Sequence, residues 1–200
     1  MRPVMIINPP IKNFAETLFI AALESDACRK LATIPMQLLR FEYESDALVD
    51  MMITETGQRA NLIAITCDAL MQKADMQKRL ITKADLEDIL DGNAIRASLS
   101  GWEQLSDNDQ TNKLDRVVVY ATIHMARFTI SDVIDRLQNI LFSFEVEQLK
   151  QSLMRLELAF IIVRKRQYYR YCVPVFKKII LESDPERMLE GEISKNLSFY

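Results

Sequence analysis

Glycine is scarce in this chain, with four in 200 residues, whereas an average protein has about 7% glycine. Because glycine serves tight turns and left-handed backbone, its scarcity disfavours a hairpin-rich fold, and the abundance of Leu, Ala, Met and Glu favours helix. A phosphate-binding P-loop needs glycines at set offsets before Lys and Ser or Thr, and no glycine here lies in such a pattern. We therefore expect a mainly α protein that does not hydrolyse ATP by itself.

Cysteine and histidine are also rare. Cys28, Cys67 and Cys172 are odd in number and far apart, which argues against a disulfide framework or a zinc site with paired ligands. We expect these cysteines to be reduced and buried. The single histidine, His124, has no evident cysteine near it, and we interpret it as structural. Because no nucleophile, base and orienting group occur together, we predict no catalytic residue, no metal site and no enzyme activity.

Long hydrophobic runs are absent. No segment approaches the roughly 18 uninterrupted apolar residues that cross a bilayer. The start Met1-Arg2-Pro3-Val4 lacks the charged, apolar and cleavage regions of a secretory signal. Apolar residues make up 49% of the chain, which is ample for a packed core. We expect a folded, cytoplasmic protein without membrane insertion.

Charge is distributed unevenly. The net charge is −3, but residues 1–110 carry 11 basic and 17 acidic side chains, whereas residues 111–200 carry 14 basic and 11 acidic side chains. The first half is therefore acidic and the second half basic. Any polyanion is expected to meet the second half.

Residues 24–90 show helical periodicity and are predicted to form a small bundle of four helices. Their expected starting caps are Ser25, Ser45, Asn61 and Thr82, the last forming an approximate capping box with Asp85. Their expected ends are Pro35, which stops the helix after Ile34, and Gly57 and Gly92. Residues 1–23 precede this bundle, and their short apolar run 4–7 indicates an edge strand or a cut end of a domain.

Residues 91–110 are polar and turn-rich and are predicted to be a linker, with Trp102 anchoring it to a neighbouring domain. In residues 111–181, apolar residues repeat at helical spacing in three successive segments. Two strand-like segments follow, with a charged turn at 164–167 between them. This order predicts a winged helix, three helices plus a β-hairpin. Residues 182–200 form an acidic tail, predicted to be a short helix and a loose end.

Several segments of the first half resemble the lid of prokaryotic AAA+ and STAND-type P-loop ATPases. The segments are Pro35-Met36, Phe41-Glu42-Tyr43, Ala47-Leu48-Val49, Thr56-Gly57-Gln58-Arg59-Ala60-Asn61-Leu62-Ile63 and Ile81-Thr82-Lys83-Ala84-Asp85-Leu86. A winged helix often follows the lid in such proteins, and the resemblance covers roughly residues 24 to 181.

The resemblance implies a nucleotide-sensing role for Arg59. A guanidinium beside a helix N-terminus can donate a fork of hydrogen bonds to a γ-phosphate, and loss of that phosphate on hydrolysis would release the lid. ATP and Mg²⁺ would then bind only with a P-loop ATPase domain, which this chain lacks. Taken from the residues alone, the alternative is a solvated Arg59 paired with Glu55.

The predicted hairpin and the residues after it are basic. Six cations with no acidic residue among them are candidates for binding nucleic acid or a partner: Arg164, Lys165, Arg166, Arg170, Lys177 and Lys178. The would-be recognition helix is less basic, because Glu145, Glu147 and Glu157 outnumber Lys150 and Arg155. Winged helices also dock proteins, so DNA and a protein partner both remain open.

The sequence leads to two hypotheses for the function of this protein. The leading hypothesis is a non-catalytic regulatory module of an AAA+/STAND-like ATPase, whose winged helix contacts a protein partner or DNA. The alternative is a free-standing winged-helix DNA-binding transcriptional regulator with an N-terminal helical domain for dimerisation or sensing.

Overall fold

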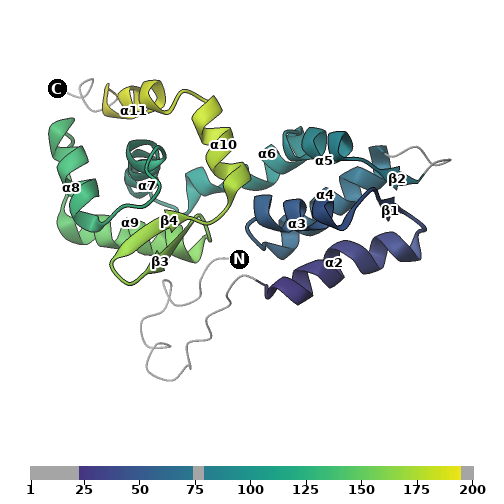
Figure 1. The fold of residues 1–200 in the computed structure, drawn as a ribbon. Coiled ribbons are helices and arrows are strands. Elements are labelled where there is room, and N and C mark those ends of the chain that lie inside the picture. Colours follow the sequence, from purple (N-terminus) through teal and green to yellow (C-terminus); the bar gives the residue numbers. More distant parts are fainter. Residues whose placement is uncertain (1–22, 74–78, 195–200) are drawn as a thin grey trace.

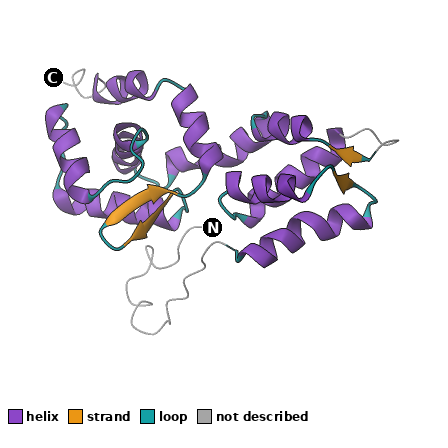
Figure 2. Ribbon diagram, in the orientation of Figure 1, coloured by secondary structure: helices purple, strands orange, loops and turns teal. Residues whose placement is uncertain are grey.

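A computed structural model describes residues 23–73 and 79–194, which are mainly helical with two small two-stranded sheets (Figure 2). The chain folds into two halves that lie side by side, the first coloured purple to teal and the second green to yellow (Figure 1). The predicted strand at residues 4–7 and the predicted loose end at 195–200 lie outside the described residues.

The first half is built around α4, which the other helices surround. Its elements are α2 (Ser25–Leu38), β1 (Glu42–Tyr43), α3 (Asp46–Glu55), α4 (Ala60–Lys73), β2 (Leu80–Ile81), α5 (Lys83–Leu90) and α6 (Asn93–Leu99). Leu62, Ile63 and Leu70 of α4 are buried, and α2, α5 and α6 pack against this helix. The parallel pairing of β1 with β2 was not predicted, because strands of two residues have no recognisable periodicity.

Two of the predicted helix starts are correct. Thr82 and Asp85 form a complete capping box at α5, and Ser45 stands at the N-cap of α3 without a side-chain bond. The other two predicted caps are wrong by small offsets. Glu24 precedes α2, so Ser25 is its first residue, and α4 begins at Ala60, before Asn61.

The prediction that Pro35 ends the first helix is wrong, because α2 continues to Leu38. Proline removes one backbone hydrogen-bond donor from a helix, but burial and hydrogen bonds stabilise the helical turn that follows Pro35. The side chain of Met36 is fully buried in the core. The N–H of Leu39 donates to the carbonyl of Pro35 at 3.2 Å, and the N–H of Phe41 donates to that of Met36 at 2.9 Å. Burial of the final turn therefore outweighs the tendency of proline to end a helix.

The second half is built around α7. Its elements are α7 (Asp109–Thr122), α8 (Ile130–Asn139), α9 (Val146–Leu158), β3 (Ile162–Lys165), β4 (Tyr168–Tyr171), α10 (Pro174–Glu182) and α11 (Pro185–Ser194). The predicted apolar stripe of α7 is confirmed, since Leu114, Val117, Val118 and Ala121 are buried. Helices α8, α9 and α11 pack against α7. Thr129 caps α8 in a second complete capping box.

Two ion pairs fix the helices around α7. Arg155 of α9 holds the fully buried carboxylate of Asp115 through two hydrogen bonds of 2.9 and 2.8 Å. Arg116 binds Glu192 of α11 through two bonds of 3.0 Å. Since both carboxylates are buried, each pair fixes the position of its helix more strongly than a surface pair would.

The hairpin turn is shorter than predicted. Arg164 and Lys165 were expected in the turn, but they belong to β3 and lie opposite Tyr169 and Tyr168 of β4. Only residues 166 and 167 remain as the turn, and Arg166 has a φ of +59°. An isolated bridge between Phe128 and Tyr169 adds a second partner to β4, on the edge away from β3.

Residues 91–110 are more structured than the predicted linker, because they contain α6 and the short 3-10 helix η2 (Ser100–Gln104). The predicted anchoring by Trp102 is confirmed. Its ring packs edge-on against Tyr120 of α7 at 5.7 Å and against Phe176 of α10 at 5.5 Å between ring centroids. Of this segment, η2 is thus packed on the second half, whereas α6 packs on the first.

Candidate functional site

The β3–β4 hairpin has one face toward the core and one toward solvent. Successive side chains of a strand alternate between faces, so the register places Ile162 and Tyr169 on one face and Lys165, Tyr168 and Arg170 on the other. Ile162 and Tyr169 are buried, and the ring of Tyr169 stacks on Phe128. The outward face therefore presents two cations and one aromatic ring.

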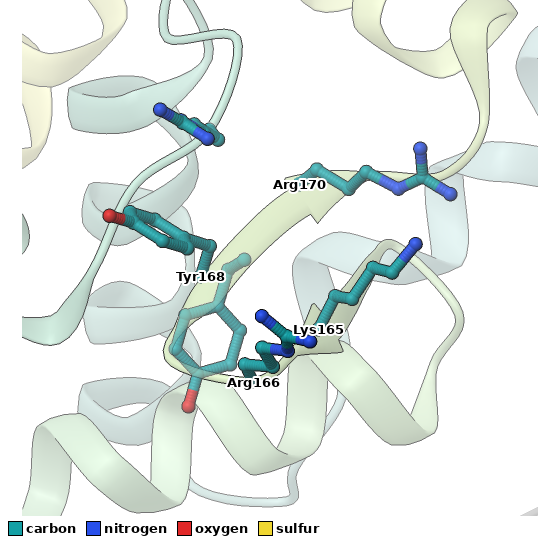
Figure 3. A pocket seen from close by; sticks show the side chains of 6 residues that line it. Lys165, Arg166, Tyr168 and Arg170 are labelled. Carbon is teal, nitrogen blue, oxygen red and sulfur yellow. The ribbon is translucent and has the colours of Figure 1, made fainter.

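A cavity of about 450 Å³ lies against this outward face. Its lining residues are Arg127, Lys165, Arg166, Tyr168, Tyr169 and Arg170. Arg127 reaches it from the loop between α7 and α8, with its guanidinium carbon 4.6 Å from the centroid of the Tyr168 ring. Figure 3 shows the side chains of Lys165 and Arg170 extending to the same side of the hairpin.

The charges of this cavity are not neutralised within the described part of the chain. Lys165, Arg166 and Arg170 are exposed, and none of their side chains forms an ion pair with a described carboxylate. Unpaired cations of this kind attract phosphate or carboxylate groups. This cationic cavity is the main candidate binding site.

The other three predicted basic residues lie elsewhere. Arg164 braces the hairpin, since its Nε donates to the carbonyl of Arg166 at 3.0 Å and its guanidinium lies over the Tyr169 ring. The Nζ of Lys177 donates to the carbonyl of Met125 at 2.9 Å. Lys178 of α10 forms an ion pair with Asp91, which follows α5. The structure therefore divides the predicted set of six into two groups of three.

Sequence reasoning missed Arg127 as a member of the cavity. It stands in a loop far before the hairpin in the chain. The one local signal is its neighbour Phe128, but pairing of that residue with Tyr169 depends on the tertiary fold. No spacing rule connects Arg127 with Tyr168.

Arg59 lies at the junction of the two halves, in the loop between α3 and α4. Gly57 in this loop has a φ of +60°, as expected of a left-handed helix terminator. A Cβ atom at Gly57 would stand 2.2 Å from the carbonyl oxygen of Cys172, so the loop touches the end of the hairpin directly.

The side chain of Arg59 is half-buried, and its burial lowers the pKa of the guanidinium, an effect that the nearby Cys172 partly offsets. Arginine stays protonated in proteins despite such shifts. Within the described ranges, Arg59 forms no ion pair with Glu55 or any other carboxylate. Among the described residues, the guanidinium charge thus has no carboxylate counterpart.

Two ion pairs cross the junction besides these backbone contacts. Arg96 of α6 binds Glu182 of α10 at 2.6 Å, and Lys178 of α10 binds Asp91. Helix α10 consequently lies next to α6, as Figure 1 shows. The two halves thus contact each other at the loop of Arg59 and along α10.

The remaining candidate groups form no site. Cys28 and Cys67 are buried free thiols, and burial raises the pKa of the half-buried Cys172 thiol, which donates to the carbonyl of Phe160. His124 is exposed. In residues 23–73 and 79–194, no group of three or more His, Cys, Asp or Glu residues could hold a metal ion. None of the helices described there has the length and apolarity that crossing a membrane requires.

No protein-family model, curated protein or solved structure matches the chain. The resemblance to AAA+ and STAND lids therefore stays a hypothesis.

Proposed function

We propose that this chain is a non-catalytic regulatory and interaction module of an AAA+/STAND-like ATPase, with residues 111–181 forming a winged helix that contacts the partner. The order of elements supports the winged helix. Helix α7 is followed by the bridging residue Phe128, then by α8, α9 and the two hairpin strands. With Phe128 in the place of the first strand, this order is similar to the helix, strand, helix, helix, strand, strand order of winged helices.

The observation that carries the proposal is the position of Arg59. Its guanidinium has no carboxylate partner among the described residues, and its loop contacts the end of the hairpin through Gly57 and Cys172. A phosphate held by Arg59 at the start of α4 would gain from the guanidinium and from the helix dipole. If phosphate binding or loss shifted this loop, the shift would act directly on Cys172, the residue that follows β4.

In this role Arg59 detects the phosphate and its loop transmits the change to the hairpin, whereas ATP would be hydrolysed in another domain. ATP and Mg²⁺ would be held by a P-loop domain, in the same polypeptide or in a partner, and Arg59 would contact the γ-phosphate from outside that domain. The hairpin then changes its position relative to its partner when the loop moves.

Site-specific cross-linking tests the role of Arg59. A photo-reactive amino acid at Ala60, which is exposed beside Arg59, is placed in the full-length protein in its native cells. We expect cross-linked peptides from a P-loop domain, and we expect Arg59→Gln to weaken the cross-link. Ala97 on α6 is an exposed control position that should not give these peptides. Cross-links at Ala60 that contain no P-loop sequence would overturn the proposal.

The unpaired cations of the hairpin favour one second candidate, a free-standing winged-helix regulator that binds duplex DNA, with the first half serving dimerisation or sensing. The exposed residues of α9 give it mixed support, because Gln148 and Gln151 can contact base edges, whereas Lys150 is paired with Glu147. Sequence-selective duplex binding by a dimeric form of the purified protein would favour this candidate.

A further inference from the structure

We propose that the cationic cavity of the hairpin binds single-stranded nucleic acid, with bases stacked against Tyr168 and Arg127 and phosphates held by Lys165, Arg166 and Arg170. The inference rests on the proposed role of the second half as the partner-binding part, and it names the chemistry of that partner. It does not depend on the role of Arg59.

The first argument is electrostatic. Lys165, Arg166 and Arg170 are exposed, line one cavity, and lack carboxylate partners in the described residues. Of the other basic residues nearby, Lys178 is paired with Asp91, whereas Arg164 donates to the carbonyl of Arg166 and keeps its charge beside the cavity. Positive charge is therefore gathered at the hairpin, where release of counterions from a phosphate chain would favour binding.

The second argument is the planar surface beside these charges. The guanidinium of Arg127 lies 4.6 Å from the centroid of the Tyr168 ring. Tyrosine rings and arginine planes are the groups on which proteins stack unpaired bases. The neighbouring volume of about 450 Å³ falls in the range that accommodates a small planar ligand. Phosphate contacts alone would not need this surface.

The third argument concerns the helix that would read a duplex. In a helix-turn-helix protein the recognition helix enters the major groove and contacts base edges. On α9 the exposed residues are mixed: Gln148 and Gln151 can hydrogen-bond base edges, Lys150 is paired with Glu147, and Met154 and Leu158 are apolar. The helix therefore carries little net positive charge for a duplex backbone, and the surface with stacking groups and unpaired cations is the hairpin, where the bases of a single strand are free to stack.

Fluorescence anisotropy with a labelled oligothymidylate of about 12 nucleotides, within the usual range for one binding fold, tests the proposal on the full-length protein. We expect salt-dependent binding with a slope of log K against log salt of about −2, as three phosphate contacts would give on a single strand. Tyr168→Ala should weaken binding by about tenfold without changing that slope, because a stacked base is lost and no charge is lost. Tyr168→Phe should bind like the natural protein.

The charge variants provide the matched comparison. Replacing Lys165, Arg166 and Arg170 with alanine should abolish binding at physiological salt and flatten the salt dependence. Lys178→Ala removes a cation that is paired with Asp91 outside the cavity and should leave the affinity unchanged. Circular dichroism of each variant checks that it is folded.

Three results would overturn the proposal. They are absence of binding at low salt, tighter binding to a duplex of equal length with no effect of Tyr168→Ala, and equal affinity for polyaspartate, which would indicate an acidic protein partner. Each of these leaves the cross-linking result at Ala60 unaffected. Failure of the nucleic-acid proposal is thus distinguishable from failure of the ATPase-module proposal.

Discussion

At the scale of single residues, Gly57 is a position where the backbone allows little change. Its φ of +60° disfavours any side chain, and a Cβ atom there would overlap the carbonyl oxygen of Cys172. The contacted atom belongs to the backbone and cannot rotate away. The close approach of the two halves at this loop therefore depends on the absence of a side chain.

We expect Gly57→Ala to lower the free energy of unfolding by about 2–4 kcal/mol, through left-handed strain and overpacking against Cys172. Urea unfolding followed by circular dichroism measures the change. Gly191→Ala is the matched control, because Gly191 lies within α11 with open space around it, and it should raise stability by about 0.5–1 kcal/mol. Equal effects of the two substitutions would contradict the close contact at Gly57.

At the scale of elements, the start of α5 shows how a local sequence signal fixes a helix. The Oγ1 of Thr82 accepts a hydrogen bond from the N–H of Asp85, and the carboxylate of Asp85 accepts bonds from the N–H and the hydroxyl of Thr82. These bonds from Thr82, with a smaller effect of Lys73, hold the pKa of Asp85 below its ordinary value of 3.8. The ionised form of Asp85 therefore stabilises the fold.

The sign of the pH dependence follows from that shift. Because the pKa is lower in the folded state, the stabilisation is fully present above about pH 4 and is lost as the pH falls through the folded-state value. We expect Asp85→Asn to lower stability by about 0.5–1 kcal/mol at pH 7, with a smaller difference from the natural protein near pH 2. Denaturant unfolding at several pH values measures this difference.

Asp88→Asn is the control on the same helix. Among the described residues Asp88 pairs with Lys73 alone, at an exposed position, so its loss should change stability by less than about 0.5 kcal/mol. An Asp85→Asn effect that is the same at pH 2 and pH 7 would show that the capping box is not the cause.

At the scale of the whole molecule, the segment that links the two halves is held on the second half by the apolar packing of Trp102. Trp102 is almost fully buried between Tyr120 and Phe176 of the second half. The pairs Arg96–Glu182 and Lys178–Asp91 are partly exposed and contribute little by comparison. Trp102 is therefore the main anchor of the segment that links the halves.

We expect Trp102→Ala to lower stability by about 3–5 kcal/mol, as is typical of removing a buried aromatic side chain, and to split the calorimetric unfolding transition into two. The double substitution Arg96→Ala with Lys178→Ala should lower stability by less than about 2 kcal/mol in total and keep the transition single. Scanning calorimetry distinguishes these outcomes. A larger effect of the double variant would place the coupling in the ion pairs.

The sequence by itself determined most of the local structure. The capping box at Thr82, the left-handed Gly57 and the apolar stripe of α7 follow from hydrogen bonds, backbone preferences and periodicity within a few residues. The helical character and the hairpin were predictable for the same reason. Trp102 as an anchor was predictable because it is an isolated aromatic residue in a polar segment.

Only the tertiary structure decided where these elements meet. It brought Arg127 onto Tyr168, placed Gly57 against Cys172, and separated Lys177 and Lys178 from the cations of the cavity. It also kept α2 helical past Pro35 through burial of Met36. Such contacts join residues far apart in the chain, and they arise from the way helices pack. No local pattern encodes them, because the free energy that selects them belongs to the assembled core.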